Sequence, residues 1–369
     1  MVRIIFAAVV ALHGMIHIFG FLKAFGFAQL NQLTQVISRP VGVIWAITSG
    51  LFILSAVLFG ARISWWWIIG LIALIPSQAL IAGSWQDAKF GTILNAVILV
   101  GIILGFGAWN FDRKVQGEID TVLAGSSVSE EKIISGESID RLPRPVQKWL
   151  RSAGVPGTES IHNLKLMQSG ELRLNPDQSW SNVKAEQYVN TETPAFLWRV
   201  NMKVFSVLPV VGRDKYVDGR GDMEIKLASL IPVVNESSNE KLDQAALQRY
   251  LAEICWYPTA ALNPYIDWEG IDNQTAKATM EYGSTSGSVT FQFTEGGDLE
   301  KISAMRYRGS AETDEKKEWF GEIRETKVIN GIRMPTKIDI SWVLDGQVFT
   351  WYRFEVTDLE FNVQPVSAS

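Results

Sequence analysis

Long apolar stretches alternate with short polar connections in the first part of the chain. Each stretch is close to the about 20 residues that a helix needs to cross a bilayer. The four stretches are Ile4–Leu22, Val41–Phe59, Ile63–Gly83 and Phe90–Phe111. Asp87 is the one acidic residue in this region. The pattern predicts a bundle of four transmembrane helices over residues 1–111.

The pattern changes abruptly at Asp112, where charged residues become frequent. Residues 112–141 are polar and rich in Ser and Glu, which is typical of a linker with one short helix. Residues 142–363 alternate between apolar and polar positions over most of their length. We therefore expect a soluble domain over residues 142–363, followed by a tail over residues 364–369.

Antiparallel strands should make up most of the soluble domain, because period-2 alternation is typical of strands that bury one face. Five strands are expected within residues 163–229 and six within residues 275–361. The pairs Asn330-Gly331 and Asp345-Gly346 indicate two-residue hairpin turns. The six C-terminal strands should therefore form a meander.

One helix interrupts the predicted strands. Asn239 is a suitable N-cap, the apolar face includes Leu247 and Ile254, and Pro258 ends the segment. The predicted fold class is therefore α+β. A four-helix transmembrane bundle precedes a large curved antiparallel β-sheet, a half-barrel, with a packed helix.

The net charge and the cysteine content argue against several classes of function and site. The membrane part carries five basic residues and one acidic residue, a net +4, which leaves −9 for the rest of a chain whose total is −5. An acidic domain of this kind is a poor nucleic-acid binder. Cys255 is the single cysteine, so neither a disulfide nor a zinc cluster is indicated. We expect no metal and no cofactor.

The basic residues that flank the predicted helices indicate their orientation, because cytoplasmic loops carry an excess of Lys and Arg. One side of the membrane has four such residues: Arg3, Arg62, Arg113 and Lys114. The other side has three: Lys23, Arg39 and Lys89. This bias predicts a multi-pass protein of the bacterial inner (cytoplasmic) membrane with both termini and the soluble domain in the cytoplasm.

Four polar side chains inside the predicted bundle are site candidates. His13 and His17 share one helical face, and Gln78 and Asn95 lie at about the depth of His17 in their own helices. Polar side chains at one depth can join helices by hydrogen bonds, and ionisable groups in a bilayer also mark functional sites. A polar layer that joins the helices and a redox or quinone site are therefore both open. Haem is disfavoured, because two histidines on one face cannot bind opposite sides of one iron.

The helix of the soluble domain carries the densest cluster of candidates. Arg249 and Glu253 have the i, i+4 spacing of an ion pair, and Trp256 follows them. A Glu253 buried in the concave face of the sheet would be a candidate general acid or base. The alternative is a solvated ion pair with Trp256 as a packing anchor. Asp214 and Tyr216 complete the ligand-binding candidates, and no catalytic motif assigns a catalytic residue.

The soluble domain resembles a bacterial domain family of unknown function. The motifs that carry the resemblance are Leu142-Pro143-Arg144-Pro145-Val146, the block from Arg249 to Glu253 with Trp256 and Pro258, and Pro335 with Trp342. In its strand order the family looks like the lipoprotein-carrier folds, whose half-barrel sheets hold acyl chains. The resemblance therefore implies a sheet that can hold an apolar ligand.

The membrane part resembles the DoxX-type four-helix proteins. The resemblance lies in Leu12-His13-Gly14, Phe21-Leu22-Lys23 and Trp85-x-Asp87-Ala88-Lys89. It agrees with a bundle of four helices.

Our leading hypothesis is a non-enzymatic integral membrane protein whose soluble domain binds a lipid or another hydrophobic small molecule at the membrane surface. Membrane lipids are then its expected partners. Two alternatives stay open. One is an enzyme, either a membrane redox protein or a hydrolase that uses Glu253, and the other is an interaction scaffold.

Overall fold

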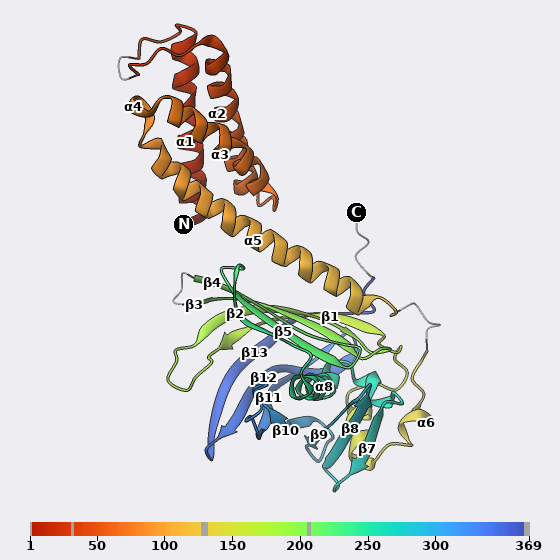
Figure 1. Ribbon diagram of the computed structural model, residues 1–369. Helices are drawn as coiled ribbons and strands as arrows, with labels where there is room; N and C mark the ends of the chain where they lie inside the picture. Colours follow the sequence, from red (N-terminus) through yellow and green to blue (C-terminus); the bar gives the residue numbers. More distant parts are fainter. Residues whose placement is uncertain (1, 31–32, 127–131, 205–207, 365–369) are drawn as a thin grey trace. The chain divides into compact units, whose positions relative to one another are not determined.

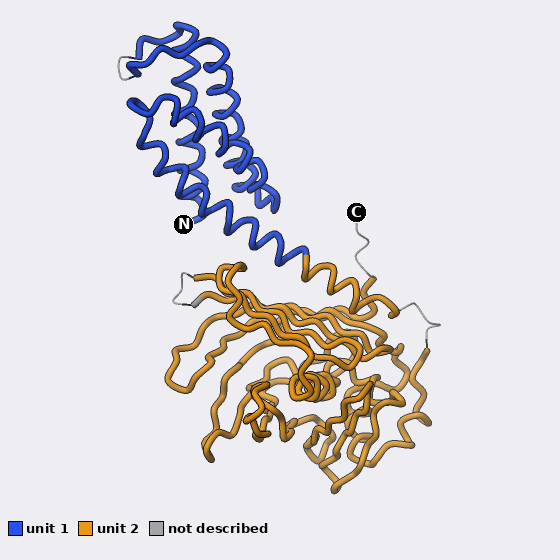
Figure 2. The backbone as a smooth tube through the Cα atoms, in the orientation of Figure 1, with its two compact units in different colours: residues 1–113 blue, residues 114–369 orange. Residues whose placement is uncertain are grey.

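The computed structural model describes residues 2–30, 33–126, 132–204 and 208–364. The chain divides into two compact units, residues 1–113 and residues 114–369 (Figure 2). The middle of the predicted linker, residues 127–131, lies outside the described residues, as does the predicted tail beyond residue 364.

The first unit is made of helices. They are α1 (Val2–Ala24), α2 (Arg39–Gly60), α3 (Trp66–Gly83), the short α4 (Trp85–Ala88) and α5 (Gly91–Leu123). Within the described residues, all but α4 are long and apolar enough to cross a membrane, which makes four candidate spans. The predicted number of helices long and apolar enough to cross a membrane is confirmed.

The fourth candidate span, α5, is longer than predicted. A linker was predicted to begin at residue 112, but α5 continues to Leu123. Its last turns bury Val115, Ile119 and Val122, a spacing of four and three residues that places all three on one helical face. The helix continues because this apolar stripe packs within the second unit.

The charged residues that suggested a linker are paired with strand residues of the second unit. The buried guanidinium of Arg213 lies 3.0 Å from Glu118 and 2.6 Å from Asp222. Lys114 lies 2.9 Å from Glu224. These ion pairs join the end of α5 to strand residues of the second unit, so the end of α5 belongs to the folded domain.

The described residues of the second unit form a sheet of thirteen antiparallel strands (Figure 1). The strand order is β6-β5-β4-β3-β2-β1-β13-β12-β11-β10-β9-β8-β7. Strands that follow one another in the sequence are neighbours in the sheet, except β6 and β7, which lie at its opposite edges, and β1 also pairs with β13. The strands are β1 (Asn163–Leu172), β2 (Ser181–Asn190), β3 (Ala195–Val204), β4 (Leu208–Val217), β5 (Arg220–Leu227), β6 (Ile231–Ser237), β7 (Ile266–Gly270), β8 (Thr275–Tyr282), β9 (Thr285–Phe293), β10 (Leu299–Tyr307), β11 (Lys316–Ile329), β12 (Ile332–Leu344) and β13 (Gln347–Phe361).

Eleven of these strands were predicted, including the six-strand meander from β8 to β13. Both expected hairpin turns are present, with positive φ at Asn330 and Gly331 and at Asp345 and Gly346, as a type I′ turn requires. The two strands that the sequence analysis missed, β6 and β7, form the two edges of the sheet.

The sheet curls around helix α8 (Glu240–Ala252). Strands from both halves of the sheet contact this helix, namely β4 and β5 on one side and β8, β9 and β10 on the other, and Figure 1 shows the helix enclosed by them. Asn239 caps it as predicted, with its side-chain oxygen accepting from the backbone N–H of Lys241 at 2.9 Å. The predicted α+β fold with a half-barrel sheet is confirmed.

Shorter helices complete the second unit. These are α6 (Gly136–Ile139), α7 (Arg144–Ser152) and two 3₁₀ turns, η1 (Glu253–Trp256) and η2 (Pro258–Leu262). The predicted helix was expected to reach Ile254, but it tightens into η1 after Ala252. Together, α8 and η1 fill the concave face of the sheet with buried side chains.

Gly170 on β1 is a point of close approach. A Cβ atom there would overlap the backbone oxygen of Arg353 and lie 2.8 Å from the Cα of Phe354. Gly170→Ala should therefore lower the free energy of unfolding by about 1–3 kcal/mol. Gly117→Ala is the matched control, because its Cβ position on α5 has no atom within 4 Å apart from its chain neighbours and the nearby helix backbone.

Thermal unfolding of the whole chain can be followed at Cys255, which is buried. Burial, with a contribution from the charge of Glu253, raises the pKa of this thiol well above its usual value, so a thiol-reactive dye should label it only after the domain unfolds. Equal labelling midpoints for Gly170→Ala and Gly117→Ala would contradict the close packing at Gly170.

Candidate functional site

The four polar candidates of the bundle are joined by hydrogen bonds. His13 Nε2 lies 2.8 Å from Asn95 Oδ1, and Asn95 Nδ2 donates to Gln78 Oε1 at 3.0 Å. His17 is connected through Ser77, whose hydroxyl oxygen lies 2.8 Å from His17 Nε2 and 3.0 Å from Asn95 Oδ1. Ser77 was not among the sequence candidates, although a serine beside Gln78 in an apolar helix is a signal of the same kind.

This polar layer connects α1, α3 and α5. His17 Nδ1 donates to the backbone oxygen of His13 at 2.9 Å, so both ring nitrogens of His17 have partners. Among the described residues no group of three or more His, Cys, Asp or Glu side chains could hold a metal ion. The contacts observed in this layer are hydrogen bonds between helices.

The candidates of the soluble domain gather around Arg249 on α8. Its guanidinium donates to Glu253 Oε1 at 2.8 Å and to Asp214 Oδ2 at 2.6 Å. Gln187, which the sequence analysis missed, accepts from Arg249 at 3.3 Å and donates to Glu253 Oε2 at 2.5 Å. The side chains of Arg249, Asp214 and Glu253 are only 16%, 10% and 13% exposed. The expectation of a solvated Arg249–Glu253 pair is therefore wrong, because α8 packs inside the sheet.

Strand register brings the partners of Arg249 together. Gln187 on β2 pairs with Trp198 on β3, which in turn pairs with Asp214 on β4. Residues that pair across strands lie on the same face, so the three side chains form one row facing α8. The guanidinium carbon of Arg249 lies 4.9 Å from the ring centres of Trp198 and Phe196, which allows cation–π attraction.

The cluster contains as many guanidinium groups as carboxylates. Burial alone would lower the pKa of Arg249, but the carboxylates of Glu253 and Asp214 raise it above its usual value. Arg306 lies close enough to sense the same groups: burial and the positive charge of Arg249 lower the pKa of Arg306 to about 10. Both guanidinium groups are therefore charged at neutral pH, opposite two carboxylates.

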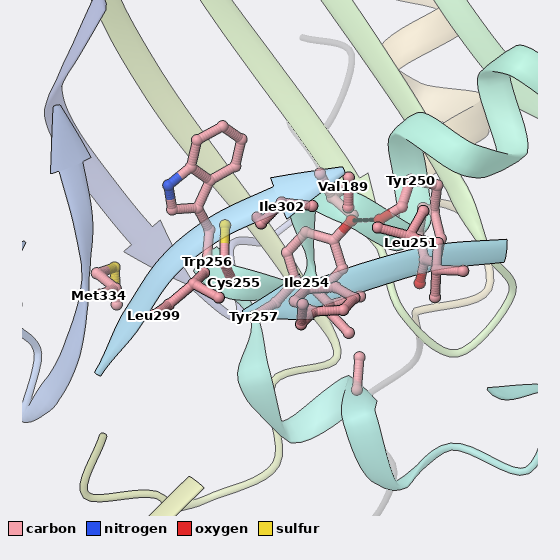
Figure 3. Close-up of a cluster of buried hydrophobic side chains, with 14 of the residues drawn as sticks. Val189, Tyr250, Leu251, Ile254, Cys255, Trp256, Tyr257, Leu299, Ile302 and Met334 are labelled. Carbon is pink, nitrogen blue, oxygen red and sulfur yellow. Dashed lines mark hydrogen bonds between the residues drawn. The ribbon is translucent and has the colours of Figure 1, made fainter. Parts of the chain in front are cut away.

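Trp256 and Tyr216 lie in the core. Trp256 is almost completely buried and donates its indole N–H to the backbone oxygen of Pro335 at 3.0 Å. Figure 3 shows Trp256 and its neighbour Cys255 in this core, with Met334 nearby. Tyr216 is also fully buried, and burial raises the pKa of its hydroxyl group. Both positions agree with packing, the alternative raised for Trp256 from the sequence.

Residues 140–361 match the family model described as "Family of unknown function (DUF6920)". The chain belongs to this family. The resemblance seen in the sequence, to a bacterial family of unknown function, is thereby confirmed. All residues of the Arg249 cluster lie within the DUF6920 region, whereas the polar layer of the bundle lies before it.

Among solved structures, this DUF6920 protein is similar to a DUF1329 family protein from Desulfovibrio piger. The sequence identity is 11% and the TM-score is 0.35, over 63% of this chain and 95% of that chain. A search of curated proteins gives no match.

Proposed function

We propose that this protein is a non-enzymatic membrane protein whose soluble domain binds a lipid or another hydrophobic ligand at the membrane surface. The observation that carries the proposal is a group of exposed apolar side chains at one edge of the sheet. The concave face is covered by α8 and η1 among the described residues. The ligand is therefore assigned to the edge.

The exposed group, called the apolar edge here, consists of Leu208, Ile231 and Val233, which are 39%, 60% and 65% exposed. These residues come from β4 and β6. Leu227 of β5 lies between these strands, because it pairs with Ile231 and with Val210. Exposed apolar side chains that cluster in this way mark an interaction surface, whereas single ones are common on any protein.

Lipid is the ligand that we expect at the apolar edge, because the domain is connected to a candidate membrane span. The helix that enters this domain, α5, is continuous with a candidate membrane span, so the domain stays close to a bilayer. An edge strand with apolar side chains is a liability in water, because it can pair with another chain. Contact with the apolar region of the bilayer covers it.

The Arg249 cluster supports a non-enzymatic role. A general base must reach the proton that it removes from a substrate. Both carboxylate oxygens of Glu253 already accept hydrogen bonds, one from Arg249 and one from Gln187. The cluster therefore fixes α8 to β2 and β4, and we propose no catalytic role for Glu253.

We also propose that the protein is a multi-pass protein of the bacterial inner membrane with its soluble domain in the cytoplasm. The support is the distribution of basic residues around the four helices, since positive charge favours the cytoplasmic side. The soluble domain would then lie on the side of the membrane whose leaflet contains anionic lipids.

A fluorescent label at the apolar edge should be quenched by lipid. Ile231→Cys, labelled with an environment-sensitive dye in vesicles that contain spin-labelled lipid, should lose most of its fluorescence. Val328→Cys is the matched control, since Val328 lies on β11 and is 62% exposed. The native Cys255 is buried and should not react.

Two outcomes would overturn the proposal. Equal quenching at positions 231 and 328 would show that the edge has no special contact with lipid. Self-quenching between labelled copies without quenching by lipid would show instead that β6 pairs with a second copy of the chain.

A further inference from the structure

Two arginine side chains at one end of the sheet have no carboxylate partner. Arg173 directly follows β1, and Arg308 directly follows β10. Arg173 donates to the backbone oxygens of Thr350 and Pro176, each at 3.0 Å. Arg308 donates to the backbone oxygen of Leu174 at 3.2 Å. Within the described residues, no carboxylate oxygen lies within 4.0 Å of the nitrogen atoms of either guanidinium group.

Aromatic rings hold these guanidinium groups close together. The guanidinium carbon lies 5.3 Å from the ring centre of Phe349 in Arg173 and 5.8 Å from it in Arg308. The ring centre of Trp180 lies 4.6 Å from the guanidinium carbons of both Arg173 and Arg353. Cation–π contacts of this kind fix an arginine in place without removing its charge. These three arginines with Phe349 and Trp180 are called the basic rim here.

The carboxylates near the basic rim lie beside Arg353 or have other partners. Glu171 and Asp339 lie 3.8 Å and 3.9 Å from the guanidinium nitrogens of Arg353. Asp314, in the loop after Arg308, accepts from a backbone N–H group of that loop. Like charges that are held close together repel one another, and an anion bound beside them relieves this repulsion. The basic rim is therefore a candidate anion site in a domain whose net charge is −9.

The free N–H groups of the two arginines suit a phosphate group. A guanidinium group has five N–H donors, and the bonds described above use two from Arg173 and one from Arg308. The planar arrangement of the remaining donors matches the oxygen atoms of a phosphate. Exposed apolar side chains adjoin the basic rim: Leu174, which follows Arg173, is 54% exposed, and Val348, which precedes Phe349, is 64% exposed. A phosphate with an apolar part therefore matches this surface.

The basic rim and the apolar edge lie at the same end of the strands (Figure 1). Leu172, the last residue of β1, pairs with Ser181, the first residue of β2. Because the sheet is antiparallel, ends and starts of successive strands alternate along this side as far as β6. The same end therefore carries Arg173 and also Leu208 and Ile231, at the starts of β4 and β6. A lipid surface that contacts the apolar edge lies on the side of the sheet where the arginines are.

We propose that Arg173 and Arg308 bind the phosphate group of an anionic lipid. Both guanidinium groups donate to the phosphate oxygens, while Leu174 and Val348 contact the apolar part of the lipid. The inference rests on the proposed function, which supplies the lipid, and adds the class of headgroup. Lipid is the source of the phosphate because exposed apolar side chains adjoin the arginines and because the domain is connected to a candidate span.

Calorimetric titration of the purified full chain in a nonionic detergent tests the proposal. Three probes are compared: dihexanoyl phosphatidic acid, which is anionic, dihexanoyl phosphatidylcholine, which has the same acyl chains and no net charge, and inorganic phosphate. Phosphatidic acid should bind about fivefold or more tightly than either of the others. A single arginine near an anionic lipid surface already contributes an effect of this size.

Variants locate the binding. Arg173→Gln with Arg308→Gln should weaken the binding of phosphatidic acid about 25-fold, fivefold for each arginine. Arg308→Gln alone removes one bond to a backbone oxygen and should weaken binding about fivefold, so the test does not depend on the folding of the double variant. Arg324→Gln with Arg333→Gln is the matched control. It removes the same charge from arginines that are paired with carboxylates and should bind as the wild type does.

Three results would overturn the proposal. Equal binding of phosphatidic acid and phosphatidylcholine would show that the charge of the headgroup is not recognised. Unchanged binding of phosphatidic acid by Arg308→Gln would place the anion elsewhere. Inorganic phosphate that binds as tightly as phosphatidic acid would assign the site to the free ion.

The two proposals fail in different ways. If any of these three results is found while lipid still quenches the label at position 231, the proposed function stands and the basic rim is not its headgroup site. A preference for phosphatidic acid without quenching at position 231 would contradict the apolar edge alone.

Discussion

Replacement of Arg249 by methionine should lower the free energy of unfolding by about 3–5 kcal/mol, the usual effect of removing one partner from a buried ion pair. The reason is that Arg249→Met leaves the carboxylates of Asp214 and Glu253, which are 10% and 13% exposed, without their cation. At about 2–4 °C per kcal/mol for a domain of this size, the labelling midpoint of Cys255 should fall by roughly 6–20 °C.

Arg324→Met is a matched control for this prediction. Arg324 also contacts two carboxylates, Glu322 at 2.6 Å and Asp339 at 3.0 Å, but its side chain is 52% exposed. An exposed network of this kind contributes at most about 1 kcal/mol. If both variants unfold at the same temperature, the Arg249 cluster is not a buried electrostatic unit.

A double variant separates lost charge from lost packing. Arg249→Met combined with Glu253→Gln removes one cation and one carboxylate, so Asp214 and Arg306 remain as one negative and one positive charge. We expect it to be more stable than Arg249→Met alone. A double variant that is less stable would indicate that packing against Trp198 and Phe196, and not charge, dominates the effect.

The architecture was predictable because it follows from local patterns. Apolar length predicted the four candidate spans, and period-2 alternation with Asn-Gly and Asp-Gly turns predicted most of the sheet. The strands that were missed are its edges, where alternation is weakest: β6 exposes Ile231 and Val233, and β7 has only five residues. An edge strand buries less than a central one, so its sequence is less constrained.

The end of α5 shows a second limit. Lys114 and Glu118 gave residues 112–123 the polar composition of a linker, but they pair with Glu224 and Arg213. The composition of a segment gives the number of its charged residues but not the residues with which they pair. The neutralising groups lie about a hundred residues further along the chain, so pairing was not visible locally.

The candidate sites could be predicted where position along a single helix was enough to identify their residues. Depth along a helix brought His13, His17, Gln78 and Asn95 into consideration together, and the i, i+4 spacing predicted the pair of Arg249 with Glu253. Asp214 was proposed, but its pairing with Arg249 depends on the register of β3 and β4, which the sequence does not determine. Gln187 was missed for the same reason.

Reporter fusions should show that both termini face the cytoplasm. Alkaline phosphatase fused after Phe361 should be inactive, whereas the same enzyme inserted at Gly26, between α1 and α2, should be active. Arg3 donates to the backbone oxygen of Phe59 at 2.5 Å, so the start of α1 and the end of α2 lie at the same end of the bundle. Phosphatase activity at Phe361 would place the soluble domain outside the cytoplasm.

Charge variants test whether basic residues cause this orientation. Arg3→Ala with Arg62→Ala reduces the proposed cytoplasmic side from four basic residues to two, against three on the other side, and should give molecules of both orientations. Lys23→Ala with Lys89→Ala reduces the opposite side and should keep the phosphatase at Phe361 inactive. If the first pair of substitutions leaves the reporters unchanged, the early folding of the acidic soluble domain, and not the charge bias, holds that domain in the cytoplasm.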